Sequence, residues 1–168
     1  MFLIARAITY ATLFVGIVLV FLPLRLLAAS RIGWPESIGA SQAAGMLLAG
    51  AGAALALWCM LTLVFVGQGT PAPFDPPRQL VVSGPYRYSR NPMYIGAGVA
   101  IFGAALFYQS LALLIYGVAL SVMAYLFVVG YEEPTLRSTF RHRYPDYCLE
   151  VRRWVGRRAK RDVERTGR

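Results

Sequence analysis

The sequence has 168 residues, of which 57% are hydrophobic, and a mean hydropathy of +0.52, whereas water-soluble domains are usually about 45–50% apolar. The formal net charge is +9, and most of the basic residues follow Tyr131. The apolar residues form blocks too long for a water-soluble core, which excludes an ordinary soluble domain. Next to such apolar blocks, a basic segment is explained more simply by membrane topology, because basic segments stay on the cytoplasmic side, than by nucleic-acid binding.

The first apolar block runs from about residue 8 to residue 29 and predicts a membrane-spanning helix. About twenty apolar residues are enough to cross a hydrocarbon core of about 30 Å. The block is too long for the apolar region of a signal peptide, which has about 7–15 residues. Pro23 is a position for a kink in this helix, and the side chain of Arg25 can reach the membrane interface.

The second block, residues 40–66, is rich in Gly and Ala, which predicts a second spanning helix that packs closely against a neighbour. Residues 67–91 contain five prolines and three glycines and cannot form a continuous helix. A connection of this length is uncommon in compact proteins and is often functional.

Two further blocks, residues 93–108 and 110–130, are separated by almost nothing and predict a tight helical hairpin. Asn91 is suited to the N-cap of the first of these helices, and Pro92 to its first turn. The sequence therefore predicts an all-α membrane bundle of about four or five transmembrane helices, with residues 1–154 as a single domain.

The chain becomes polar and basic after Gly130, with a pair of acids, Glu132–Glu133, directly at the end of the fourth block. Apolar side chains then recur at spacings of three and four, which predicts an amphipathic C-terminal helix on the membrane. Pro145 is expected to break or redirect that helix, and residues 155–168 are expected to be disordered. The apolar positions of this pattern are Leu136, Phe140, Tyr144 and Tyr147.

Charge predicts the topology. The loop with Arg78, Arg87 and Arg90 belongs on the cytoplasmic side together with the basic tail, and the uncharged hairpin turn belongs outside. Four spans with both termini in the cytoplasm follow, in the plasma (inner) membrane. The two cysteines, Cys59 and Cys148, have no metal-type spacing and are expected to be free thiols, and no metal site is expected.

The loop at residues 84–94 and the acids Glu132 and Glu133 are predicted to lie at the same membrane face. The start of the third helix favours an anionic group, and the rings of Tyr86 and Tyr94 can contact a cation. Glu132 can hold an ammonium group. S-adenosylmethionine carries a carboxylate, an amine and a sulfonium and matches all three features, although Tyr and Arg also anchor membrane interfaces.

The stretch LVVSGPYRYSRNPMYIG at residues 80–96, followed by a helical hairpin and EEPTLRSTFRHRYPDY at residues 132–147, resembles the isoprenylcysteine carboxyl methyltransferase and phospholipid methyltransferase superfamily. The resemblance covers about residues 67–153. It implies that S-adenosylmethionine is the cofactor, and its binding residues match Arg78, Gln79, Leu80, Val81, Tyr86, Asn91, Pro92, Met93, Tyr94 and Glu132.

The sequence departs from the family pattern at three places. Asn91 stands where the motif has histidine, so this side chain cannot titrate near neutral pH. The stretch Phe140–Tyr144 lacks the family's glycine and glutamate, and Val128 stands where the prenylcysteine enzymes have a substrate-contacting arginine. The last difference argues against recognition of a prenylcysteine carboxylate.

The predicted function is methyl transfer from S-adenosylmethionine, by in-line displacement, to a lipophilic or small acceptor: an isoprenylcysteine-like carboxylate, a thiol or a phospholipid amine. Glu133 is predicted to orient the site or to act as a base, and Arg87 and Arg90 to hold an anionic acceptor or membrane headgroups. Membrane lipid is the expected partner, and nucleic acid is not. The alternatives are an NADPH-dependent membrane reductase and a non-catalytic scaffold whose basic tail binds anionic lipid.

Overall fold

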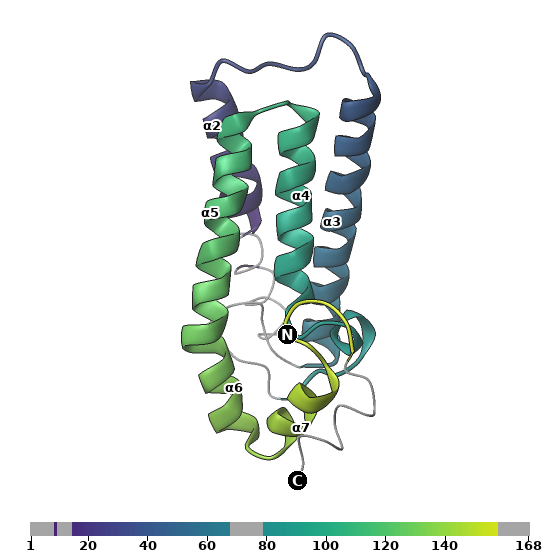
Figure 1. Cartoon of the computed structure of the whole chain (residues 1–168), viewed down its shortest axis with the longest axis vertical. Coiled ribbons are helices and arrows are strands. Elements are labelled where there is room, and N and C mark those ends of the chain that lie inside the picture. Colours follow the sequence, from purple (N-terminus) through teal and green to yellow (C-terminus); the bar gives the residue numbers. More distant parts are fainter. Residues whose placement is uncertain (1–8, 10–14, 68–78, 158–168) are drawn as a thin grey trace.

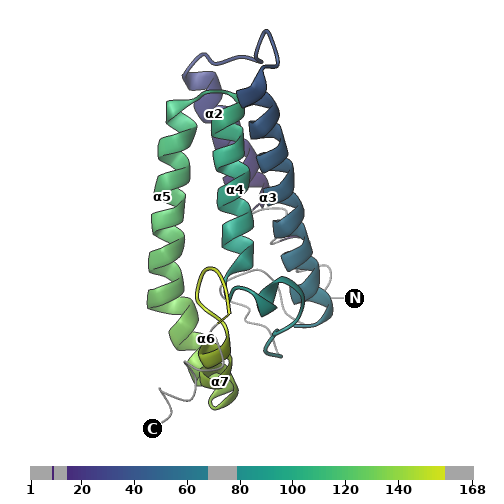
Figure 2. The ribbon, with the colours of Figure 1, turned by 45° about the vertical axis from the view of Figure 1, so that its right-hand side comes forward.

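The computed structural model describes residue 9 and residues 15–67 and 79–157. Within these residues every regular element is a helix, and extended backbone pairs only in an isolated bridge between Val151 and Arg157. The all-α prediction is therefore confirmed for the described part of the chain. Four helices run side by side as an elongated bundle (Figures 1 and 2): α2 (Leu22–Ala29), α3 (Ala40–Phe65), α4 (Pro92–Phe107) and α5 (Leu111–Phe127).

Among the described residues, two helical stretches are long and apolar enough to cross a membrane, Ala40–Phe65 and Leu111–Phe140. Two shorter apolar helices, Gly16–Ala29 and Pro92–Phe107, lie beside them. The first stretch has 26 residues, which at a rise of about 1.5 Å per residue exceeds the thickness of the hydrocarbon core. Large apolar side chains such as Leu47 and Leu126 point outward from these helices, as expected where lipid is the solvent.

The first apolar block is helical where the structure describes it. Val15–Phe21 forms a π-helix (η1) that continues directly into α2, and residues 8 and 10–14 lie outside the described part. Pro23 is the second residue of α2 and lies inside a helix that continues from η1, so its missing N–H removes one backbone hydrogen bond to the preceding turn. The change from π to α geometry thus falls immediately before the position at which the sequence predicts a kink.

Helices α3 and α4 pack backbone against backbone along a seam of four glycines, Gly45 and Gly52 on α3 facing Gly103 and Gly96 on α4. A Cβ atom added at Gly52 would lie 2.4 Å from the backbone nitrogen of Ala100, and one at Gly103 would lie 2.3 Å from that of Ala49. Such distances leave no room for any side chain. The prediction that the Gly- and Ala-rich block packs closely is confirmed.

The hairpin between α4 and α5 is as tight as predicted. Gln109 turns the chain with a φ of 48°, and Ser110 caps α5 by accepting a hydrogen bond from the backbone N–H of Leu113 at 3.3 Å. The ring of Trp34, from the loop between α2 and α3, packs against Phe107 at this end, with a centroid distance of 5.1 Å. This end of the bundle contains turns and aromatic packing, and the motif residues lie at the other end.

Helix α5 does not stop at Gly130. It passes through a π-helical turn, Val128–Glu132 (η3), into α6 (Glu133–Phe140), and a separate helix, α7 (Arg143–Glu150), follows. The break between α6 and α7 lies at Arg141, which has a φ of 41°, so the prediction that Pro145 breaks the helix is wrong. Pro145 is the third residue of α7, and the first turn of a helix tolerates proline because its N–H groups have no partner there.

The segment after α7 returns to the bundle. Val151 pairs with Arg157, the N–H of Arg152 donates to the carbonyl of Gly156 at 3.0 Å, and the N–H of Gly156 donates to the carbonyl of Tyr88 at 2.8 Å. The prediction of disorder from residue 155 onward is therefore wrong for residues 155–157, which these hydrogen bonds fix. The rest of the predicted tail, residues 158–168, lies outside the described residues.

Candidate functional site

The motif loop leads into α4 at the end of the bundle where α6 and α7 lie. It contains a short 3₁₀-helix, η2 (Gly84–Arg87), whose buried Tyr86 packs against Val81 and Cys59. The hydroxyl of Tyr147, on α7, donates a hydrogen bond to the carbonyl of Tyr86 at 2.7 Å. Burial raises the pKa of the Tyr147 hydroxyl, so this group stays protonated and remains a donor.

Asn91 is the N-cap residue of α4, as predicted, but its side chain makes no capping hydrogen bond. Its amide instead donates to the backbone carbonyl of Arg153 at 3.1 Å, and its own N–H donates to the hydroxyl of Ser89 at 3.0 Å. The reason is that the segment after α7 lies against the start of α4 and offers a buried acceptor. Asn91 therefore joins two segments that are 62 residues apart.

Tyr94 and Glu132 meet across the site. The hydroxyl of Tyr94, in the first turn of α4, donates to Oε2 of Glu132 at 3.0 Å, although the two residues are 38 positions apart. Glu132 is the last residue of the π-helical turn η3, and turns of this kind are frequent at functional sites. Tyr86 lies near both groups. The two halves of the sequence signature thus converge on one carboxylate.

The neighbouring acid, Glu133, faces a different set of groups. Arg153 grips it with two hydrogen bonds, from Nε to Oε1 at 2.7 Å and from Nη2 to Oε2 at 3.0 Å. Nη1 of Arg90 forms a further ion pair with Oε1 at 3.2 Å. Both oxygens of Glu133 are therefore occupied by guanidinium groups, and the hydrogen bond to Glu133 raises the pKa of Arg153.

The two arginines that sequence reasoning singled out differ in their surroundings. Arg90 is largely buried, contacts Glu133 and the thiol of Cys148, and its Nε is a buried donor with no hydrogen-bond partner among the described residues. Arg87 is exposed at the end of η2. Arg87 is thus the one of the two that faces outward, whereas Arg90 belongs to the network around Glu133.

The remaining predicted cofactor residues are mostly in the core. Val81 and Met93 pack with Cys59 and Tyr86, and Leu80 packs against the cluster of Tyr144, Tyr147 and Val151. Gln79 is exposed, Pro92 is buried, and Arg78 lies outside the described residues. The side chains of Leu80 and Val81 thus pack against other apolar side chains. The free thiols predicted for Cys59 and Cys148 are confirmed.

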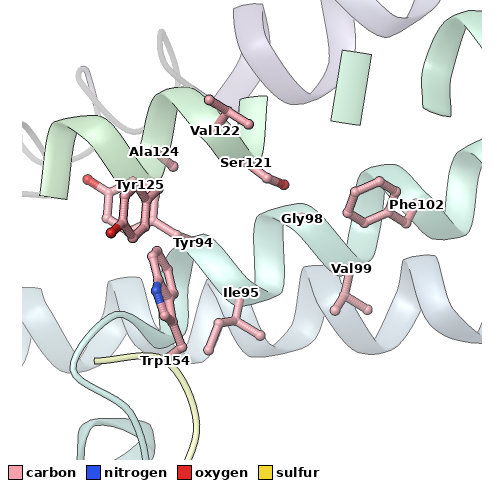
Figure 3. Close-up of a pocket in the computed structure, with 10 residues that line it drawn as sticks. All are labelled: Tyr94, Ile95, Gly98, Val99, Phe102, Ser121, Val122, Ala124, Tyr125 and Trp154. Carbon is pink, nitrogen blue, oxygen red and sulfur yellow. The ribbon is translucent and has the colours of Figure 1, made fainter. Parts of the chain in front are cut away.

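A groove of about 470 Å³ runs between α4 and α5 beside Tyr94. The described residues of its walls carry no charged side chain, and the ring of Trp154 closes one end by stacking on Tyr125 at a centroid distance of 6.3 Å (Figure 3). Such a volume is typical of sites for small ligands. The lining residues are Tyr94, Ile95, Gly98, Val99, Phe102, Ser121, Val122, Ala124, Tyr125 and Trp154.

Comparison with known protein families identifies the family of this chain. The family model described as phospholipid methyltransferase matches residues 40–143, which is more than half of the chain. The chain belongs to the phospholipid methyltransferase family. No curated protein and no solved structure matches it. The family resemblance inferred from the signature is therefore confirmed, and the apolar helices agree with a membrane methyltransferase.

The family match ends before three residues that complete the site: Tyr147, Arg153 and Trp154. Sequence reasoning used Tyr147 only as an apolar position, and it did not select Arg153 from the many arginines of the basic segment. Of the three, Trp154 is the residue that the sequence could have indicated as functional, because it is a large aromatic residue within a charged stretch. The segment after α7 is therefore a part of the site that the matched family model does not cover.

Proposed function

We propose that this family member transfers a methyl group from S-adenosylmethionine to a lipophilic acceptor, with a phospholipid as the favoured class. The observation that carries the proposal is the hydrogen bond between Tyr94 and Glu132. It places an acid and a phenol beside the start of α4, and the phenol, Tyr94, also lines the groove. The family description supports a phospholipid acceptor.

The residues present fit this cofactor. Glu132 offers a carboxylate to the amino group of S-adenosylmethionine, and the buried Nε of Arg90 lacks a partner among the described residues. A buried donor without a partner costs about 1–3 kcal/mol, so a bound acceptor group there is stabilising. The side chains of Leu80 and Val81 are packed inside, so this segment would contribute its backbone groups.

When bound, S-adenosylmethionine supplies an activated methyl group on a positively charged sulfur. The protein then has to hold the acceptor in line, which in well-oriented systems is worth about 7–11 kcal/mol. The ring of Tyr94, which lines the groove, would favour a cation, whereas Tyr86 is buried in the core. Glu133 acts as a positioning residue and not as a base, because both of its oxygens accept from Arg153 and Arg90.

The acceptor reaches the site from the membrane. The groove opens between α4 and α5, whose outward side chains are apolar, and Tyr94 lies at its wall. The proposal includes four spans with both termini in the cytoplasm. It is supported by residues 79–91 and the segments after α5, which lie at one end of the bundle and would share one membrane face (Figure 2). Arg87, exposed at that end, is suited to contact an anionic headgroup.

The test is binding of S-adenosylmethionine to the full-length protein in detergent, measured by isothermal titration calorimetry. We expect saturable binding that weakens at least tenfold in Glu132→Gln and is also weaker in Tyr94→Phe. Tyr116→Phe is the matched control, because it removes a phenol that donates to the carbonyl of Val18 at 2.7 Å, away from the site. Unchanged affinity in both folded site variants would overturn the assignment, and binding of NADPH instead would favour a reductase.

A further inference from the structure

Trp154 is the one residue in the lining of the α4–α5 groove that comes from outside these two helices. It belongs to the segment 151–157, which follows α7 and folds back onto the bundle. In Figure 3 its ring lies with those of Tyr94 and Tyr125 at one end of the groove, and Phe102 lies toward the other end. Trp154 therefore closes the end at which Tyr94 also contacts Glu132.

The position of Trp154 is fixed from both sides. Its preceding neighbour, Arg153, makes two hydrogen bonds to Glu133, and Gly156 donates its N–H to the carbonyl of Tyr88. The ring itself stacks on Tyr125, with an angle of 25° between the two planes. A side chain that is held by its backbone on both sides and by a stacked ring acts as a rigid wall.

We propose that Trp154 is a specificity-determining residue, the wall that limits the size of the acceptor head beside the methyl donor. This inference rests on the proposed function. The described residues that line the groove carry no charged side chain, and bulky rings such as Trp154 and Phe102 bound it, so its shape is the feature that can select an acceptor there. In an apolar pocket one added or missing methylene group changes selection by about 10–200-fold, and an indole ring is much larger than a methylene group.

The first experiment asks whether lipid occupies the groove at Trp154, and it needs no methyl donor. The full-length protein with Trp34→Phe and Trp58→Phe retains Trp154 as its only tryptophan. It is placed in nanodiscs of phosphatidylcholine with increasing amounts of phosphatidylethanolamine that carries bromine on the acyl carbons nearest the glycerol, and tryptophan fluorescence is recorded. We expect saturable quenching, because a lipid whose head lies in the groove brings these bromine atoms near the indole.

A pair of glycine substitutions separates the groove from the surrounding lipid. Gly98 lines the groove, and a Cβ atom there would lie 3.8 Å from the hydroxyl of Ser121, so Gly98→Leu fills the groove without a backbone collision. Gly50, on the exposed side of α3, has nothing within 4 Å of such a Cβ, and Gly50→Leu is the matched control. We expect Gly98→Leu to abolish saturable quenching and Gly50→Leu to keep it. Equal quenching in both variants would show that Trp154 contacts only bulk lipid and would overturn the proposal.

The second experiment measures selection. Methyl transfer from labelled S-adenosylmethionine is compared for phosphatidylethanolamine and its bulkier N,N-dimethyl derivative. We expect Trp154→Ala to shift the ratio of the two kcat/KM values at least tenfold toward the bulkier acceptor, with Trp154→Phe intermediate and the Kd for S-adenosylmethionine unchanged. An unchanged ratio would overturn the proposal. Loss of cofactor binding in the unmodified protein, with groove-dependent quenching retained, would instead refute the proposed function alone.

Discussion

Replacing Glu133 with alanine removes the carboxylate that Arg153 and Arg90 share. The side chains of Glu133 and Arg90 are only 7% and 11% exposed, and that of Arg153 is 32% exposed. Removing one partner of a buried ion pair costs about 3–5 kcal/mol, because the remaining charge is left without compensation. The partial exposure of Arg153 places the expected loss near the lower end, about 3 kcal/mol.

The assay is thermal unfolding of the detergent-solubilised protein, followed by circular dichroism. For a protein of about 150–250 residues, each kcal/mol shifts Tm by about 2–4 °C, so Glu133→Ala should lower Tm by about 6–12 °C. Arg153→Ala should cost less, because Arg90 still pairs with Glu133. Glu150→Ala is the control, since Glu150 pairs with Arg157 at 3.6 Å on the surface, where such pairs contribute under about 1 kcal/mol. Equal Tm values for Glu133→Ala and Glu150→Ala would refute the reasoning.

Two further predictions concern the framework and use the same unfolding assay. Gly52→Ala should destabilise the protein by about 1–3 kcal/mol, because its Cβ would meet the backbone nitrogen of Ala100, whereas Gly50→Ala should be neutral or stabilising by up to about 1 kcal/mol. If both substitutions destabilised the protein, or both stabilised it, the result would contradict the close approach of α3 and α4. Tyr147→Phe should lower stability by about 1–3 kcal/mol by leaving the carbonyl of Tyr86 without this donor, and an unchanged Tm would show that the bond contributes nothing.

The bundle helices α2 to α5 were predictable because they form from apolar blocks bounded by turn residues. Residues 40–66 were predicted for a helix observed at Ala40–Phe65, and the hairpin between α4 and α5 lies where almost no polar residue separates two blocks. Proline was less informative, because its effect depends on its position in the helix. Pro145 lies in a first turn, where it is tolerated, and the actual break occurs at Arg141.

The site was predictable to the extent that it follows the family signature. From that signature Tyr94 and Glu132 were predicted to belong to one site, and the two residues form a hydrogen bond. Of the two partners of Glu133, Arg90 was singled out from the sequence, but Arg153 was not predictable, because nothing in the sequence distinguishes it from the other arginines of the basic segment. The hydrogen bond that the Asn91 amide donates was not predictable either, because its acceptor is a backbone carbonyl, and every residue type has one.

The order in which the site is built follows from the place of residues 151–157 in the chain. Translation runs at about 5–20 residues per second, so α2 to α5 leave the ribosome seconds before this segment does. Until then Tyr88 and Arg90 lack their backbone partners in Gly156 and Arg152. A nascent chain can thus insert its helices into the bilayer while the motif loop is still unsupported. Membrane insertion and completion of the site are separate events, and the second waits for residues 151–157.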